Sequence, residues 1–249
     1  MKNIYVFLLL LLGTAAWGQE RQVRHDEQLW MGYFNQTRFT DRWGIWADVH
    51  FRTRENFVAE PSRLIGRLGL TYYIGDDLKL TNGYAFINHY PEEGHENVSM
   101  PEHRIWHQLQ MHVKEGKVRM MQWLRLEERF RRNILNDNEL ADGYRFDTRL
   151  RYNFLVNVPL TKKGFSKGGL AWVINDEVML NMSRNVRYNV FDQNRFFSGF
   201  AYYLGAHTNL QVGYMNVFQQ KASGFRYDNM HCFRVFLFQN LDLRAGKGH

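Results

Sequence analysis

Residues 42–56, RWGIWADVHFRTREN, alternate between apolar and polar side chains. The odd positions carry the apolar residues and the later even positions the charged ones: Trp43, Ile45, Ala47, Val49 and Phe51 against Asp48, His50, Arg52 and Arg54. Because successive side chains of a β-strand point to opposite faces, this pattern predicts a strand with one apolar and one charged face. The stretch alone leaves open which face lies outside.

The same alternation recurs in eleven segments that are 11 to 16 residues long: 28–39, 42–54, 62–75, 78–90, 103–114, 118–133, 144–158, 169–181, 195–205, 209–220 and 229–243. Strands of soluble sandwiches run about five or six residues, whereas a tilted strand needs about nine to eleven to cross a bilayer. The segments therefore predict an all-β fold, an antiparallel transmembrane β-barrel of about 10–12 strands. The apolar side chains at alternate positions of each strand would face lipid.

The connections support a barrel of the outer membrane. Short turns at 40–41, 75–77 and 115–117 alternate with long polar stretches at 91–102, 133–143 and 221–228. This alternation is typical of short periplasmic turns and long extracellular loops. Bacterial single-chain barrels have an even number of strands. We therefore expect residues 20–27 to form a short extra strand or to pass through the lumen, unless one segment is divided wrongly.

The first 18 residues predict a signal peptide that is cleaved before Gln19. Lys2 supplies the positive start, IYVFLLLLLG the apolar core, and Ala16-Trp17-Gly18 the small residues before the cleavage site. The apolar run is too short to span a bilayer as a helix. Residues 19–249 are then one barrel domain in the outer membrane, and its expected partners are outer-membrane lipid and the barrel-assembly machinery.

Composition excludes several other classes. A mean hydropathy of −0.49 excludes a bundle of transmembrane helices, and a single cysteine, Cys232, excludes an intramolecular disulfide and a cysteine metal cluster. The net charge of +7 would ordinarily suggest nucleic acid as a partner. Export and the spread of the arginines over many segments argue against nucleic acid.

Four stretches carry a resemblance to a known family: RWGIWADVHFRTR (42–54), LTNGYAF (80–86), EHRIWHQL (102–109) and WLRLEERFR (123–131). They resemble the family catalogued as domain of unknown function 2490, and the resemblance spans residues 28–243. Members of that family look like exported β-barrels of Gram-negative envelopes without an assigned activity. The resemblance thus supports fold and location and implies no catalytic residues. One departure is the end of the chain, Leu241-Asp242-Leu243 and AGKGH, where outer-membrane strands commonly finish on an aromatic residue.

The polar parity predicts a charge network in the lumen. Its members are Asp48, His50, Arg52, Arg54, Arg67, Arg104, Arg125, Glu127, Arg129, Arg131, Arg145, Asp147, Arg149, Arg151 and Glu177. With Arg63 and Arg195, twelve arginines share this parity with four carboxylates. One interpretation is a ladder of ion pairs that fills a narrow barrel. The other is an anion-selective path or a site for an anionic ligand, because rings of arginine select anions in pores.

Aromatic residues near strand ends or on the apolar parity, such as Trp43, Trp123 and Trp172, are expected in membrane girdles, and only Trp46 and Trp106 are expected inside. A soluble lipocalin-like barrel is the alternative fold, and it would bury the apolar parity and expose the arginines.

We expect no enzyme activity; the alternative is an outer-membrane lipid hydrolase. None of the six serines lies in G-x-S-x-G, and Ser99 sits near histidines in a loop. His103 and His107 share a strand parity but lie about 13 Å apart at a rise of about 3.3 Å per residue. We therefore expect no metal site and no cofactor.

Overall fold

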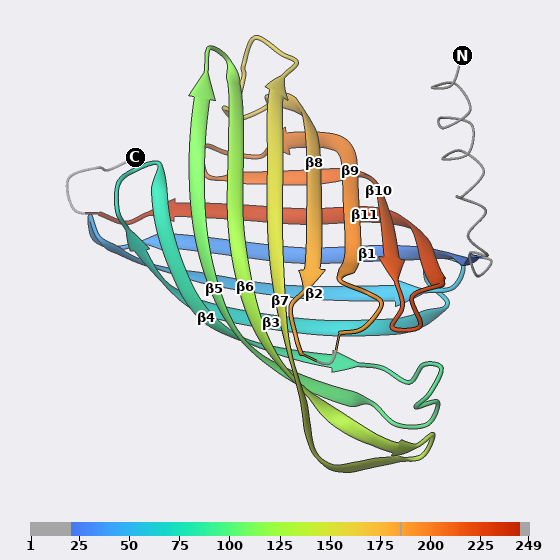
Figure 1. Cartoon of the computed structure of the whole chain (residues 1–249). Helices are drawn as coiled ribbons and strands as arrows, with labels where there is room; N and C mark the ends of the chain where they lie inside the picture. Colours follow the sequence, from blue (N-terminus) through green and yellow to red (C-terminus); the bar gives the residue numbers. More distant parts are fainter. Residues whose placement is uncertain (1–20, 185, 245–249) are drawn as a thin grey trace, which may run out of the picture.

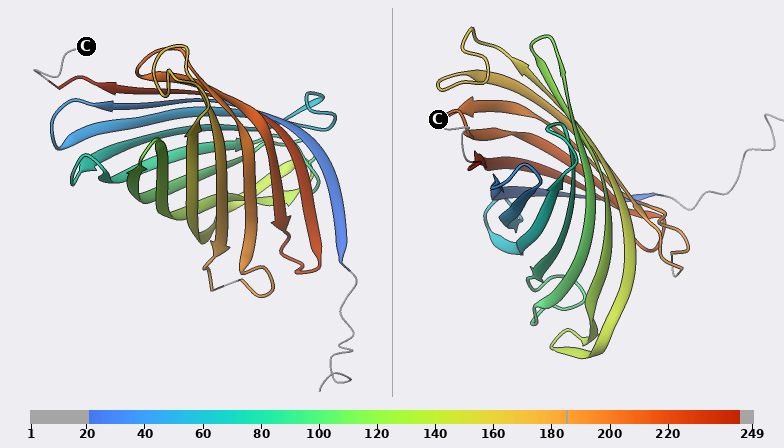
Figure 2. Two further views of the ribbon diagram at one scale, coloured as in Figure 1. Left: turned by 90° about the horizontal axis from the view of Figure 1, so that it is seen from above. Right: turned by 90° about the vertical axis from the view of Figure 1, so that its left-hand side faces the viewer.

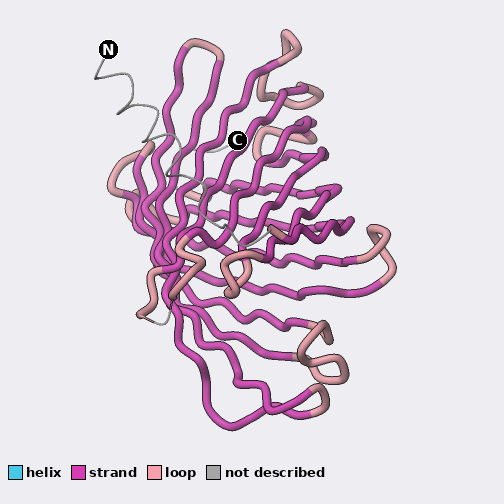
Figure 3. The backbone as a smooth tube through the Cα atoms, turned by 45° about the vertical axis from the view of Figure 1, so that its right-hand side comes forward, coloured by secondary structure: helices cyan, strands magenta, loops and turns pink. Residues whose placement is uncertain are grey.

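The computed structural model describes residues 21–184 and 186–244. These ranges form eleven β-strands and contain no helix, so none that could cross a membrane (Figure 3). The strands are β1 (Gln22–Arg38), β2 (Trp43–Arg54), β3 (Glu60–Tyr73), β4 (Leu78–His89), β5 (Met100–Glu115), β6 (Val118–Asn136), β7 (Glu139–Pro159), β8 (Leu170–Asn181), β9 (Phe191–Tyr203), β10 (Thr208–Gln220) and β11 (Arg226–Asp242). Each overlaps with one of the eleven predicted segments, with different bounds. The predicted signal peptide lies outside the described residues.

The strands close into one barrel. Every neighbouring pair is antiparallel except β1 and β11, which pair in parallel from Gln22↔Arg226 to Arg38↔Asp242 (Figure 2). A closed meander with an odd number of strands requires this, because its first and last strands run in the same direction. The expectation for residues 20–27 is therefore wrong where the structure describes them. Residues 22–27 belong to β1 and form neither an extra strand nor a segment through the lumen.

The barrel has strongly tilted strands. A row of register partners that starts at Trp30 reaches Met100 on β5 through β2, β3 and β4. In the other direction the row runs through β11, β10, β9, β8, β7 and β6. It returns to β5 at Lys114 and not at Met100. This stagger tilts the strands against the barrel axis. Accordingly, β5–β8 cross the strands β11 and β1–β3 on the opposite side of the barrel (Figure 1).

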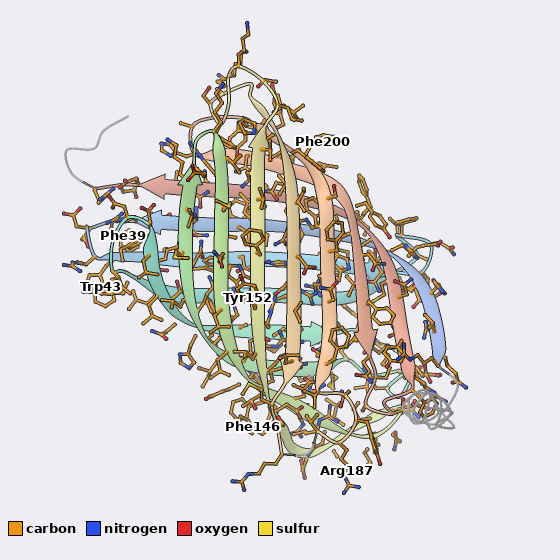
Figure 4. All side chains as sticks on the ribbon, turned by 45° about the horizontal axis from the view of Figure 1, so that its top comes forward. Phe39, Trp43, Phe146, Tyr152, Arg187 and Phe200 are labelled. Atoms are coloured by element: carbon orange, nitrogen blue, oxygen red, sulfur yellow. The ribbon has the colours of Figure 1, made fainter. Side chains whose placement is uncertain are left out.

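The charged face of β2 is the inner one. Asp48, His50 and Arg52 are 2%, 4% and 6% exposed, whereas Val49 between them is 53% exposed. Figure 4 shows the same outward placement for aromatic side chains of other strands, among them Tyr152 and Phe200. The burial excludes the lipocalin-like alternative, which required apolar residues inside and arginines outside.

The lengths of the connections differ less between the two ends of the barrel than the sequence predicted. The end of the barrel where β1 begins, here the loop end, carries connections 55–59, 90–99, 137–138, 182–190 and 221–225. The opposite end, here the turn end, carries 39–42, 74–77, 116–117, 160–169 and 204–207. The long loop predicted at 133–143 is wrong, because β6 and β7 continue to a two-residue turn. This hairpin projects past its neighbours (Figure 1, yellow-green), where no wall imposes an apolar face.

Trp106 requires two glycines beside it. Gly69, Gly83 and Trp106 are register partners on β3, β4 and β5, and the indole is 1% exposed. A Cβ added at Gly83 would lie 2.5 Å from both the indole and the carbonyl oxygen of Leu68. The glycines thus leave the space that the indole occupies against the wall.

We expect Gly83→Ala to destabilise the folded barrel by about 1–3 kcal/mol, because a new methyl group in a filled interior forces its neighbours to shift. The measurement is the urea midpoint of the refolded barrel. Gly66→Ala on β3 is the control, since nothing lies within 4 Å of its added Cβ. Equal midpoints for the two variants would contradict the role assigned to Gly83.

Candidate functional site: the charged interior of the barrel

The interior contains a cavity of about 1030 Å³. Its wall includes residues of both barrel ends, such as Arg24 and Glu93 at the loop end and His207 and Asp242 at the turn end. Of the predicted charge network, Arg52, Arg54, Arg67, Arg104, Arg125, Arg129, Arg131, Arg149, Arg151, His50 and Glu177 line this cavity. The structure thus brings most of the network to one internal space.

The other members lie beside the cavity or at its rim. Asp48 and Glu127 are 2% and 1% exposed and lie behind the arginines that they bind. Asp147 pairs with Arg131 near the loop end. Arg145 departs most from the expectation: its side chain is 56% exposed and reaches Asp147 at the rim instead of the cavity.

A chain of ion pairs runs along the inside of β5–β9. We call it the ion-pair chain; it consists of Glu102, Arg104, Glu127, Arg129, Arg149, Arg151, Glu177, Asp192 and Arg195. Each of its carboxylates binds guanidinium groups of the same strand or of nearby strands. Arginine suits this arrangement because its planar fork can bind two carboxylates at once.

Glu127 is the centre of the ion-pair chain. Arg149 donates to its Oε2 from Nε and Nη2 at 3.0 and 2.6 Å, and Arg151 donates to its Oε1 at 2.5 Å. Arg104 reaches the same carboxylate at 3.4 Å and Arg125 at 3.9 Å. All of these side chains are buried or nearly so, which makes Glu127 the shared partner of four cations.

The two ends of the ion-pair chain depend on other carboxylates. Glu102, which is fully buried, accepts hydrogen bonds from Arg104 at 2.6 Å and from Arg129 at 2.7 Å, and His89 lies 2.7 Å away. At the other end Arg151 and Arg195 share Glu177.

A smaller cluster lies on β2 and β3. Arg67 donates from Nε to both carboxylate oxygens of Asp48, at 2.8 and 3.0 Å. His50 lies 2.8 Å from the same carboxylate, and the indole of Trp46 donates to it. Asp48 therefore neutralises Arg67. The other partners of its carboxylate, His50 and Trp46, belong to the same cluster.

Three arginines, of which Arg52 and Arg234 are buried and Arg63 is half-buried, stand apart from these ion pairs. We call Arg52, Arg63 and Arg234 the unpaired arginines, because none of them forms an ion pair in residues 21–184 and 186–244. The Nε atom of each is buried without a hydrogen-bond partner. They belong to β2, β3 and β11, on the side of the barrel opposite β5–β8, and all three line the cavity.

Aromatic rings support two of the unpaired arginines, Arg52 and Arg234. The guanidinium of Arg52 lies 3.4 Å from the ring centroid of Trp30, and that of Arg234 lies 3.3 Å from the centroid of Phe197. Arg195 lies over Trp30 as well, at 5.0 Å. Stacking of this kind attracts a cation by the ring quadrupole and leaves the edge of the guanidinium free.

Glu92 in the 90–99 connection stands at the loop-end mouth of the cavity. It pairs with Arg54 at 3.8 Å and with His95 at 3.7 Å. Burial raises the pKa of Glu92, but the positive charges of Arg63, His89 and His95 outweigh burial and lower it. The side chain therefore carries a negative charge that acts on Arg63 from outside ion-pair distance.

Sequence reasoning missed two interior carboxylates and one interior arginine. Glu102 and Asp192 both bind arginines of the ion-pair chain, so the predicted ratio of twelve arginines to four carboxylates is wrong. Both precede the predicted segment starts at 103 and 195. Arg234 lay within a predicted segment, and its even position, shared with inward Phe236 and Phe238, was the signal for it.

The tryptophans also differ from the expectation. Trp46 and Trp106 are buried as predicted, but Trp30 and Trp123 are buried too, and Arg125 lies 4.6 and 4.8 Å from the rings of Trp106 and Trp123. The assignment of Trp123 to a girdle is therefore wrong. Its odd position on β6 places it on the same face as Arg125 and Glu127.

Hydrolytic and metal chemistry have few candidates in the described ranges. No described serine hydroxyl is hydrogen-bonded to a histidine: Ser166 bonds to a carbonyl, Ser183 and Ser223 accept from backbone N–H groups, and Ser198 accepts from Trp172. No group of three or more metal-ligating side chains is found among the same residues. The absence of a catalytic activity and of a cofactor stays a prediction.

Fold and interior define the class of this protein: a closed eleven-stranded β-barrel with buried ion pairs and a cavity inside. The chain belongs to the family described as protein of unknown function (DUF2490), whose model matches residues 27–229 and confirms the resemblance. It is also 24% identical over 233 residues to an uncharacterized protein of Methylorubrum extorquens (strain AM1), with 92% of this chain and 94% of that protein covered. No solved structure matches the chain.

Proposed function

We propose that this protein is an integral β-barrel of the outer membrane that admits small anions through its arginine-rich interior as a narrow, anion-selective pore. The observation that carries this proposal is the internal cavity lined by buried and half-buried arginines, among them Arg52, Arg63 and Arg234, which have no ion-pair partner in the described chain.

The outer surface supports the membrane part of the proposal. Large apolar side chains are exposed on every side of the barrel, for example Val49 at 53%, Leu68 at 60% and Phe200 at 54%. A soluble monomer rarely exposes continuous apolar surface on this scale, whereas a barrel in lipid requires it. The strands, with 12 to 21 residues each, are long enough for a tilted crossing. Export by the predicted signal peptide and insertion by the assembly machinery belong to this proposal.

The interior supports the anion part. Paired and unpaired arginines are distributed unevenly around the barrel. The ion-pair chain fills the inside of β5–β9 and acts as a scaffold, while the unpaired arginines on β2, β3 and β11 face the cavity. Uncompensated cations along a path favour anions and disfavour cations. Selectivity would therefore come from one side of the wall.

The test is conductance of the refolded full-length mature barrel in a planar bilayer under a KCl gradient. We expect stepwise conductance and a reversal potential that has the sign for chloride. Protein heated to unfold it before addition is the control and should give no steps. A barrel that inserts and migrates as folded on unheated gels but passes no current, or that prefers potassium, would overturn the pore.

A further inference from the structure

We infer that two of the unpaired arginines, Arg52 and Arg63, form a binding seat for a small oxyanion group, phosphate or carboxylate, borne by a solute that enters the cavity. The inference deepens the proposed function and rests on it, because it takes solutes to reach the interior. It names the place and the chemistry of the interaction.

The seat lies on one row of register partners. Arg234, Trp30, Arg52, Arg63 and His89 are successive partners across β11, β1, β2, β3 and β4. Side chains of direct partners on one face of an antiparallel pair are about 4.5–5.5 Å apart at Cβ, and like charges there repel. Arg52 and Arg63 are such a pair. Their arrangement is unfavourable in the empty barrel and becomes favourable when an anion lies between them.

Hydrogen bonding points the same way. Neither the side chain of Arg52 nor that of Arg63 makes a hydrogen bond in the described chain, although Arg52 is only 6% exposed and both line the cavity. Buried polar groups are nearly always satisfied, and a buried donor without a partner costs free energy. The donors are therefore available to a ligand and would be satisfied by one.

The fork geometry determines the class of ligand. A guanidinium offers parallel N–H donors that match two oxygens of a carboxylate or a phosphate, which a halide cannot reproduce. The guanidinium of Arg52 lies over the ring of Trp30 at 3.4 Å, and the residue lines the cavity. Two such cations side by side favour an oxyanion with two negative charges over one with a single charge.

The binding experiment uses the refolded full chain in detergent and titrates inorganic phosphate, succinate and chloride at constant ionic strength. Tryptophan fluorescence reports the site through Trp30, and calorimetry gives the affinity. We expect saturable binding of phosphate or succinate and none of chloride. Tighter binding of phosphate than of succinate would assign a phosphate-bearing solute, and the reverse a dicarboxylate. Either result supports the seat, and a response to neither ligand overturns it.

Substitutions make the test specific. Arg52→Gln and Arg63→Gln should each weaken binding about tenfold or more, because each removes a charge-assisted hydrogen bond. Arg145→Gln at the exposed rim removes the same charge and should change nothing. Glu92→Gln removes a negative charge that acts on Arg63 and should tighten binding about two- to fivefold, the size expected for a partly exposed charge. Unchanged affinity in both arginine variants overturns the seat.

Two further readouts separate the seat from the pore and from damage to the fold. Phosphate should raise the unfolding midpoint of the unaltered barrel, because a ligand stabilises the state that it binds. Arg52→Gln should lose that stabilisation and be at least as stable as the parent without phosphate, since it relieves repulsion. A conducting barrel that does not bind would overturn the seat alone. A barrel that binds and does not conduct would overturn the pore alone.

Discussion

Glu127→Gln is expected to destabilise the folded barrel by about 3–5 kcal/mol, the range measured when one partner of a buried ion pair is removed. Glu127 is 1% exposed and is the shared acceptor of Arg149 and Arg151. The neutral amide retains one acceptor oxygen but removes the negative charge. Arg149 then keeps only Asp192 and Arg151 keeps only Glu177. The buried cations repel one another with too little compensation.

Urea unfolding of the barrel in lipid vesicles, followed by band shift on unheated gels, measures this effect. Glu128→Gln is the matched control. It changes the same charge one position along β6, on the opposite face of the strand, and Glu128 makes no ion pair in the described chain. If the two variants unfold at the same urea concentration, Glu127 is not the centre of the ion-pair chain.

The sequence predicted the strands well because the barrel wall imposes alternation on them. Each strand that separates the interior from the outside must carry two different faces, so its pattern is strong. The pattern fails where the chain leaves the wall. Residues 22–27 of β1 and the end of the β6–β7 hairpin have neighbours on fewer sides, and both faces of these segments meet the same surroundings. Their sequences are mostly polar and do not alternate regularly, so they read as loops.

The sequence predicts which charged residues face the interior, but it does not predict which cation binds which carboxylate. Alternation places Arg52, Arg149 and Glu127 inside, but it cannot say which cation meets which carboxylate. Arg149 reaches Asp192 from β7 to β9 with β8 between them, and that contact depends on register and tilt. Errors of one residue at Glu102 and three at Asp192 were enough to hide two carboxylates. The unpaired arginines were therefore indistinguishable from the paired ones before the structure.

Leu68→Arg is expected to reduce the stability of the barrel in lipid by about 2–4 kcal/mol, the cost of an arginine on the lipid face near the bilayer midplane. Leu68 is 60% exposed on the outside of β3, between its register partners Ala47 and Tyr84. The effect follows from the proposed membrane location. On a barrel surrounded by water, the same substitution would replace an exposed apolar side chain by a charged one at little cost.

The comparison with Leu160→Arg isolates the contribution of the surrounding lipid to the cost of Leu68→Arg. Leu160 is 50% exposed directly after β7, at the edge of the wall, where an added arginine should cost only about 0–1 kcal/mol. The two variants carry the same chemical change, so general effects of charge on refolding cancel between them. Urea midpoints in vesicles should therefore separate Leu68→Arg from Leu160→Arg, and in both cases the interior stays untouched. Coincident midpoints would mean that the apolar outside does not face lipid, and the surface would then have to be covered by protein instead.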